Sequence, residues 1–199
     1  RLLKCVLDFM RSNAKMLPMT QRLFSDHLLL ALNHDEQAMV HKVRTLCRDV
    51  IGPQAAAVAK QDVFAWETFR TLCREGVVAT AFPREYGGTD ARQVLRIRII
   101  EELGRVCSTS ASMITGTDLS ARAVVAGASP ALRAQLLPRL CTGEIQTAFA
   151  LTESGAGSDV RSLSSVARRE GDHYMLSGSK KFITRATTAD WLMVIARLD

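Results

Sequence analysis

The sequence predicts an α+β protein in which a helical bundle comes first and strands follow. Apolar residues recur at helical spacing as far as Gly143, and beyond it the apolar period falls from about 3.6 residues to about 2. Alternating apolar and polar residues over short runs are typical of strands with one buried face. With 199 residues, 47% of them hydrophobic, the chain can form one large packed domain or two small ones.

Five helices are expected before Gly143. The first begins at Asn33, whose side chain can accept from first-turn N–H groups while Glu36 reaches back in a capping box. Its apolar stripe ends near Val50, and we expect Gly52 and Pro53 to interrupt the helix. The other four helices are expected at about residues 65–75, 90–104, 110–127 and 130–143, the last with Ser129 as N-cap and Pro130 in its first turn.

The third helix contains two arginines within an apolar pattern. The stripe expected to face inward comprises Val94, Ile97, Ile100 and Leu103. Burial of an unpaired guanidinium costs several kcal/mol, so Arg96 and Arg98 either reach solvent or the helix packs differently.

Four strands are expected after Gly143, at residues 145–151, 164–170, 173–184 and 191–197. The middle two would form a hairpin that turns at Gly171 and Asp172. The last strand would leave an open edge, which makes the end of the chain a poor place for a domain to stop. We therefore interpret the chain as an amino-terminal fragment of a longer protein.

The charge and the cysteines limit the classes of partner and compartment. A net charge of +6 and a pI near 9.4 favour polyanionic partners such as nucleic acid or a phosphorylated ligand, but the arginines are dispersed at helical spacing. Five cysteines without a C-x-x-C pair argue against disulfides and a zinc site, and no metal site is expected. No apolar run approaches the roughly 18 residues that cross a bilayer. A reducing compartment, the cytoplasm, is expected.

Residues 1–18 are basic and amphipathic, which suggests two origins. They could be the end of a mitochondrial presequence, which makes the matrix the alternative location, or upstream sequence translated before a true start at Met19.

The segment from Phe149 to Thr184 contains the candidate binding residues. Gly155 and Gly157 allow the backbone to turn tightly and bring N–H groups close to a phosphate, and Ser158 adds a hydroxyl donor. Thr152 and Thr184 would lie at strand ends beside a flat heterocycle, with Phe149 and Phe182 as aromatic surface. The pattern lacks the third glycine of a Rossmann fingerprint, and an ordinary Ser/Gly-rich surface turn is the alternative interpretation.

With its neighbours, this segment resembles the acyl-CoA dehydrogenase family. ALTESGAGSD at residues 150–159 is similar to the family's A-x-T-E-P-x-x-G-S-D, and GDHYMLSGSKKFIT at 171–184 is similar to the G-x-x-Y-x-L-x-G-x-K-x-[FW]-I-T that follows it. FPREYGG, IIEELGR and LLPRLCTGE, at 82–88, 99–105 and 136–144, resemble landmarks of its helical domain in the same order. The resemblance runs from about residue 24 to the end.

The resemblance implies a fold, a reaction and a set of site residues. The expected domains are an extension at 1–23, a helical domain at 24–144 and an incomplete, antiparallel, barrel-like β domain at 145–199. The expected reaction is FAD-dependent dehydrogenation of an acyl-CoA to 2,3-enoyl-CoA, with Ser158 also contacting substrate. The implied FAD-binding residues are Phe149, Leu151, Thr152, Gly157, Ser158, Phe182, Ile183 and Thr184.

Further implications concern the catalytic base and the partners. The family's catalytic carboxylate lies in a carboxy-terminal helical domain that this chain lacks, so no catalytic residue is assigned and the chain alone is expected to be inactive. Glu153 is expected to be a structural hydrogen-bond acceptor. The implied partners are an acyl-CoA, an electron-transfer flavoprotein or another electron acceptor, and further copies in a homotetramer.

The chain departs from the family pattern at several positions. Ser154 stands where proline is common, and Arg185 replaces a small or amide residue after Thr184. Residues 113–117 would line the acyl pocket, where Met113 and small hydroxyls select no chain length.

Three alternatives remain. One is a flavin-dependent oxidase or monooxygenase on the same fold, and another is a fragment that binds nothing. The third is a nucleic-acid-binding relative, which would need a clustered basic face with stacking aromatics, whereas aromatics are 6% here.

Overall fold

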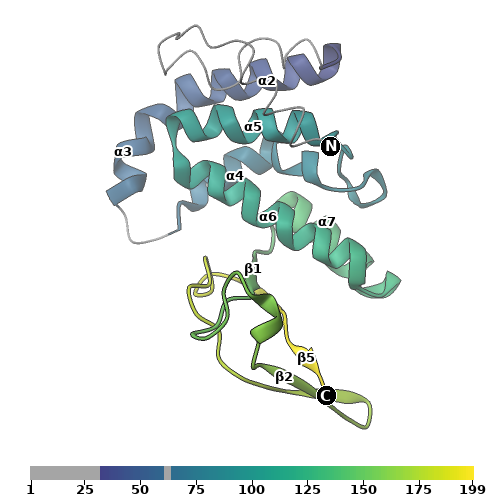
Figure 1. Cartoon of the computed structure of the whole chain (residues 1–199). Coiled ribbons are helices and arrows are strands. Elements are labelled where there is room, and N and C mark those ends of the chain that lie inside the picture. Colours follow the sequence, from purple (N-terminus) through teal and green to yellow (C-terminus); the bar gives the residue numbers. More distant parts are fainter. Residues whose placement is uncertain (1–31, 61–63) are drawn as a thin grey trace, which may run out of the picture.

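The computed structural model describes residues 32–60 and 64–199. The expected extension at residues 1–23 and the start of the expected helical domain lie outside the described residues. The helices form one part of the molecule and the strands form a second part beside it (Figure 1). Among the helices of these described ranges, none combines the length and the apolar character needed to cross a membrane.

The order of elements agrees with the predicted α+β class, with helices first and strands second. The helical part contains α2 (His34–Leu46), the π-helical turn η3 (Cys47–Ile51), α3 (Gly52–Lys60), α4 (Trp66–Arg74), the 3-10 turns η4 (Val78–Ala81) and η5 (Arg84–Tyr86), α5 (Gln93–Val106), α6 (Ser108–Gly127) and α7 (Pro130–Thr142). The second part contains β1 (Thr147–Ala150), the 3-10 turn η6 (Val160–Ser162), β2 (Val166–Glu170), β3 (His173–Ser177), β4 (Trp191–Val194) and β5 (Arg197–Leu198).

Local signals set several helix ends as the sequence predicts. The Glu36 N–H donates to Asn33 Oδ1 at 3.0 Å while the Asn33 N–H donates to Glu36 Oε2 at 2.9 Å, which completes the capping box of α2. Ser129 Oγ accepts from the Leu132 N–H at the start of α7. Gly143 ends the same helix with a left-handed φ of 75°, a conformation that costs glycine least.

The predicted break at Gly52 and Pro53 is wrong, because the chain stays helical from α2 through η3 into α3. In the π-helical turn the Gly52 N–H donates to the Cys47 carbonyl, five residues back. A Cβ at Gly52 would lie 2.8 Å from that carbonyl oxygen, so glycine permits the turn instead of ending the helix. Pro53 is the second residue of α3, so its missing N–H affects only the turn that joins η3 to α3.

The buried stripe of α5 differs from the predicted one. Leu95, Ile99 and Leu103 face the core, whereas Ile97 is 44% exposed. The predicted stripe was wrong because it assumed that Arg96 and Arg98 do not lie in the interior. Arg96 and Arg98 are only 7% and 1% exposed, and both are paired with carboxylates.

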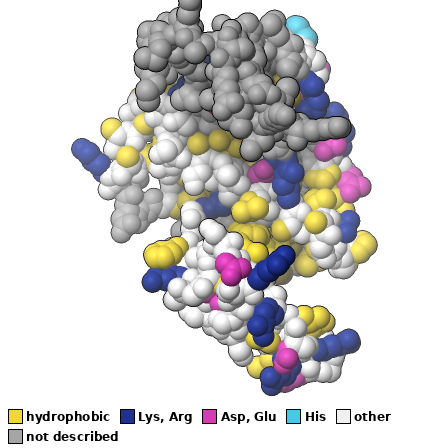
Figure 2. All heavy atoms as spheres, viewed as in Figure 1, with side chains coloured by type: hydrophobic (Ala, Val, Ile, Leu, Met, Phe, Trp, Pro, Cys, Tyr) yellow, Lys and Arg dark blue, Asp and Glu magenta, His cyan; other side chains and the backbone are white. Residues whose placement is uncertain are grey.

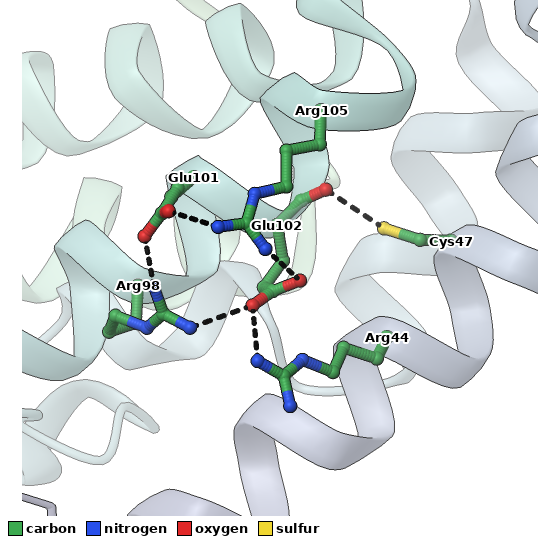
Figure 3. A network of polar contacts seen from close by, with 6 residues as sticks. All are labelled: Arg44, Cys47, Arg98, Glu101, Glu102 and Arg105. Atoms are coloured by element: carbon green, nitrogen blue, oxygen red, sulfur yellow. Dashed lines mark hydrogen bonds and ion pairs between the residues drawn. The ribbon is translucent and has the colours of Figure 1, made fainter. Parts of the chain in front are cut away.

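A network of ion pairs compensates the charge of Arg98 (Figure 3). Its guanidinium donates to Glu101 and, at 2.9 Å, to Glu102 Oε1, which also accepts from Arg44 of α2 at 2.9 Å. Arg105 donates to Glu101 at 2.5 Å. The network therefore joins α2 to α5 through charges that are buried together rather than singly.

The strand part is partly antiparallel and partly parallel. β2 and β3 form the predicted antiparallel hairpin, in which Val166 lies opposite Ser177. The other two pairings, β1 with β4 and β2 with β5, are parallel, which differs from the antiparallel expectation. The reason is the connections, because each paired strand returns after a long excursion of the chain instead of a tight turn.

The strand expected at 173–184 ends at Ser177, so Thr184 does not end a strand as predicted. Gly178 has a φ of 147°, and a Cβ there would collide with Ser165. The chain then leaves the sheet, and Phe182 and Arg185 take left-handed φ values of 58° and 66°. The segment after β3 is therefore an irregular loop that returns to the helical part.

Candidate functional site

Glu153 holds together the two segments that carry the candidate site residues. Its carboxylate accepts from the Ser164 N–H at 2.7 Å, from Ser164 Oγ at 2.5 Å and from the Ser165 N–H at 3.0 Å. Lys180 Nζ donates to it at 2.8 Å and to the Leu151 carbonyl at 3.0 Å. These contacts tie the end of β1 to the start of the loop after β3.

The hydrogen bonds of Glu153 also define its chemistry. The ammonium of Lys180, followed by the donors of Ser164 and Ser165, holds the pKa of the Glu153 carboxyl well below its usual value. A carboxylate with so many donors is a weak base. These contacts confirm that Glu153 is a structural hydrogen-bond acceptor, and its exclusion as the catalytic base stays a prediction.

Residues 153–156 form a tight turn in the candidate anion-binding loop. The Glu153 N–H donates to the Ala156 carbonyl at 2.9 Å, and the Ala156 N–H returns a longer bond of 3.4 Å. Gly155 and Gly157 keep φ outside the left-handed region, and a Cβ on either would meet nothing within 4 Å. Glycine is therefore not required here by the protein's own packing, but it leaves the backbone open to a bound group.

The N–H groups that follow this turn have room for a phosphate. Gly157 and Ser158 are exposed, and among residues 32–60 and 64–199 their N–H groups donate to no protein acceptor. Asp159 is the nearest carboxylate along the chain, but it is engaged with the Arg161 N–H and with Ser162 Oγ. Free N–H groups beside open space are the donor set that a pyrophosphate requires, so the loop fits this part of FAD.

The candidate residues of the two segments lie side by side around Thr152. The Lys181 N–H donates to the Thr152 carbonyl at 2.8 Å, which places Phe182 next to the end of β1. Phe182 is 81% exposed, with Lys181 Nζ 4.9 Å from its ring centroid. Phe149 and Leu151 are half-buried. An exposed aromatic ring in a strained backbone conformation fits a role in contacting a ligand or another chain.

Ile183 and Thr184 line different cavities. Ile183 lines one of about 310 Å³ within the strand part, together with Ala150 and Lys180. Thr184 lines another of about 350 Å³, where the loop meets the beginning of α6. The residues that complete the second cavity are Phe64, Ser108, Thr109, Ser112, Met113 and Arg185. The structure therefore brings Thr184 to the expected acyl-pocket segment, but not to the cavity that Ile183 lines.

Sequence reasoning assigned no role to Lys180 or Arg185, which the structure places at the site. Lys180 stands at the lysine of the quoted motif, so the signal for it was present. Arg185 was noted only as a departure. Its Nη1 donates to the Met113 carbonyl, Thr117 Oγ1 and Gln146 Oε1 at 3.5, 3.3 and 3.2 Å. The loop after β3 is thereby attached to α6.

Two protein-family models match this chain. The N-terminal domain of acyl-CoA dehydrogenase matches residues 33–144, and the middle domain matches residues 148–199.

Individual relatives are similar over most of the chain. It is 33% identical to cyclohex-1-ene-1-carbonyl-CoA dehydrogenase of Syntrophus aciditrophicus and 31% identical to the short-chain specific acyl-CoA dehydrogenase of Clostridium acetobutylicum, over 84% of the chain in each case. The structure of a glutaryl-CoA dehydrogenase from Mycobacterium smegmatis in complex with FADH2 has a TM-score of 0.80 and 26% identity over 87% of the chain. The chain spans 41%, 45% and 44% of these three proteins, respectively. The chain belongs to the acyl-CoA dehydrogenase family.

Proposed function

We propose that the protein containing this chain uses FAD to dehydrogenate an acyl-CoA thioester between its α and β carbons. The observation that carries the proposal is the pair of free N–H groups at Gly157 and Ser158, beside a turn whose glycines leave the backbone open. Family membership supports the same reaction. When bound, FAD supplies the acceptor for the hydride that leaves the β-carbon.

The proposed roles follow the positions of the residues around Thr152. Gly157 and Ser158 bind the pyrophosphate through their N–H groups and the Ser158 hydroxyl, which also contacts the acyl-CoA. Phe149, Leu151 and Thr152 lie along the pyrimidine side of the flavin ring. Phe182, Ile183 and Thr184 flank the ring near N5. Ile183 and Thr184 line different cavities, so we propose that they contact the ligand from different sides of the loop after β3.

The chain's own contribution to catalysis is binding and charge stabilisation. Donors fixed before the reaction stabilise negative charge as it develops, because they need no reorganisation in the transition state. The Lys181 N–H donates to the Thr152 carbonyl at 2.8 Å. This bond fixes the backbone of Thr152, which suits its hydroxyl to the role of such a donor. We assign no catalytic base among the described residues, and we do not propose Glu153 for that role because its carboxylate accepts four hydrogen bonds.

The proposed partners follow from the reaction. An acyl-CoA is the substrate, and the reduced enzyme passes its electrons to an electron-transfer flavoprotein or another acceptor. We also propose assembly into a homo-oligomer.

Apolar and basic side chains are interspersed over the visible face of the strand part, without a single basic patch of the kind that binds nucleic acid (Figure 2).

The proposal is tested by titrating the full-length protein, from which FAD has been removed, with FAD and following the loss of flavin fluorescence. Ser158→Ala removes a donor to a charged oxygen, which is worth about 1.5–3 kcal/mol, so affinity should fall about ten- to a hundred-fold. Ser154→Ala is the matched control, since Ser154 is exposed and its removal should leave affinity unchanged.

Ser154→Pro tests the geometry of the loop. Ser154 occupies the second position of the turn at 153–156, where proline is favoured, so FAD affinity should be preserved. Equal affinities of Ser158→Ala and the parent full-length protein, or no FAD binding by that protein at all, would contradict the proposal.

A further inference from the structure

Arg185 is a half-buried cation that has no counter-charge in the part of the chain that the structure describes. No carboxylate in residues 32–60 or 64–199 forms an ion pair with it, and its guanidinium donates to a carbonyl, a hydroxyl and an amide oxygen. These bonds are 3.2–3.5 Å long, and the buried Nε has no acceptor. The two buried arginines of α5 differ from Arg185, because Arg96 and Arg98 each form ion pairs with carboxylates.

The position of the Arg185 side chain requires free space beside α6 and an unusual backbone conformation. A Cβ at Gly116 of α6 would collide with the guanidinium, so glycine leaves the space that the side chain occupies. Arg185 also has a φ of 66°, which is unfavourable for a residue with a side chain. Strained residues cluster at functional sites, where the surrounding structure maintains them.

The cavity beside Arg185 is suited to an anion. Of its seven lining residues, four carry hydroxyl groups, none is acidic, and Arg185 carries the single formal charge. Ser108 and Thr109 are also the first two residues of α6, which has no side-chain cap, so their N–H groups lack intrahelical acceptors. Burial lowers the pKa of Arg185, and a bound anion would oppose that shift.

We propose that Arg185 is the counter-charge for a carboxylate at the far end of the acyl group, so that the protein prefers dicarboxylic acyl-CoA thioesters. The inference rests on the proposed function. Hydroxyls from α6 and Thr184 supply further donors to the carboxylate.

The first experiment measures binding of acyl-CoA pairs that have equal carbon number, namely succinyl with butyryl, glutaryl with pentanoyl, and adipyl with hexanoyl. With FAD present, at least one dicarboxylic member should bind ten-fold or more tightly than its neutral partner. Arg185→Gln should abolish this preference without changing the affinity for the neutral member by more than about two-fold. Arg185→Lys, which keeps the charge, should retain part of it.

The matched control is Arg169→Gln, which removes the same charge from an exposed position on β2. It should leave the preference intact. A second measurement does not depend on coenzyme A. The Nε–H resonance of Arg185, identified by its loss in Arg185→Gln, should shift on addition of pentanoate and not of pentanamide.

The two experiments separate the two proposals. If acyl-CoA thioesters bind without preference for a terminal carboxylate, the carboxylate site is overturned and the proposed function stands. If no acyl-CoA binds while pentanoate still shifts the Arg185 resonance, the proposed function fails and the anion site stands. If neither response is seen, both are overturned.

Discussion

The ion pair between Arg96 and Asp118 provides a direct test of how the buried arginines of α5 are tolerated. The two side chains come from neighbouring helices and are only 8% and 15% exposed. Asp118→Asn keeps the shape of the side chain but leaves Arg96 without a carboxylate among the described residues. Removal of one partner from a buried pair costs about 3–5 kcal/mol. Because Asp118 is not fully buried, we expect a loss of about 3 kcal/mol.

Urea unfolding measures this loss. With an m-value of about 2 kcal/mol/M, a loss of about 3 kcal/mol moves the midpoint down by about 1.5 M. Glu144→Gln is the control, because the Arg139–Glu144 pair is 41% and 58% exposed and should contribute less than about 1 kcal/mol.

The double variant Arg96→Met/Asp118→Asn should recover part of the stability lost in the single variant, since it removes the unpaired cation. If Asp118→Asn is as stable as Glu144→Gln, the account of Arg96 as a charge compensated by Asp118 is wrong.

Three further predictions concern the second part of the chain and the cysteines. Glu153 has a folded pKa below its unfolded value of 4.5, so its stabilising contribution is present above about pH 4.5 and is lost as the pH falls further. The free energy of unfolding of the parent chain should thus fall between about pH 5 and 3 by a contribution that is missing in Glu153→Gln, and identical pH profiles of stability would disprove this. Gly178→Ala should lower the unfolding midpoint more than Gly171→Ala, because its Cβ meets Ser165 whereas that of Gly171 meets nothing within 4 Å; an equal effect would show that the loop can adjust. Burial, with a contribution from Cys141, raises the pKa of Cys73 to about 12, so iodoacetamide should alkylate it far more slowly than a free thiol at pH 8, as peptide mapping would reveal.

The features predicted correctly from the sequence are those set by local chemistry. Asn33 and Glu36 cap each other within one turn, and Ser129 caps α7 in the same way, so neither depends on distant residues. The β2–β3 hairpin turns at Gly171, whose φ of 67° suits glycine. The change from helical to alternating period likewise marks the end of α7 and the start of the strand part.

The features that were missed depend on partners far away in the sequence. Arg96 is buried because Asp118 of another helix meets it, which no periodicity within α5 could indicate. β3 ends early because Gly178 lies against Ser165 of the strand part, and alternation alone continued the pattern to Thr184. Arg185 could be recognised as unusual by its position, but its packing against Gly116 is evident only in the folded chain.

The bonds around Glu153 also affect how the protein could be engineered. The Lys181 N–H to Thr152 bond and the Lys180–Glu153 pair fix both ends of residues 154–179, while the tip of the β2–β3 hairpin points into open space at Gly171. Once the ends of a loop are fixed elsewhere, doubling its length costs only about 0.6 kcal/mol. The hairpin tip is therefore the place to insert a reporter peptide or an affinity tag, since the added chain would be held away from the candidate cofactor site.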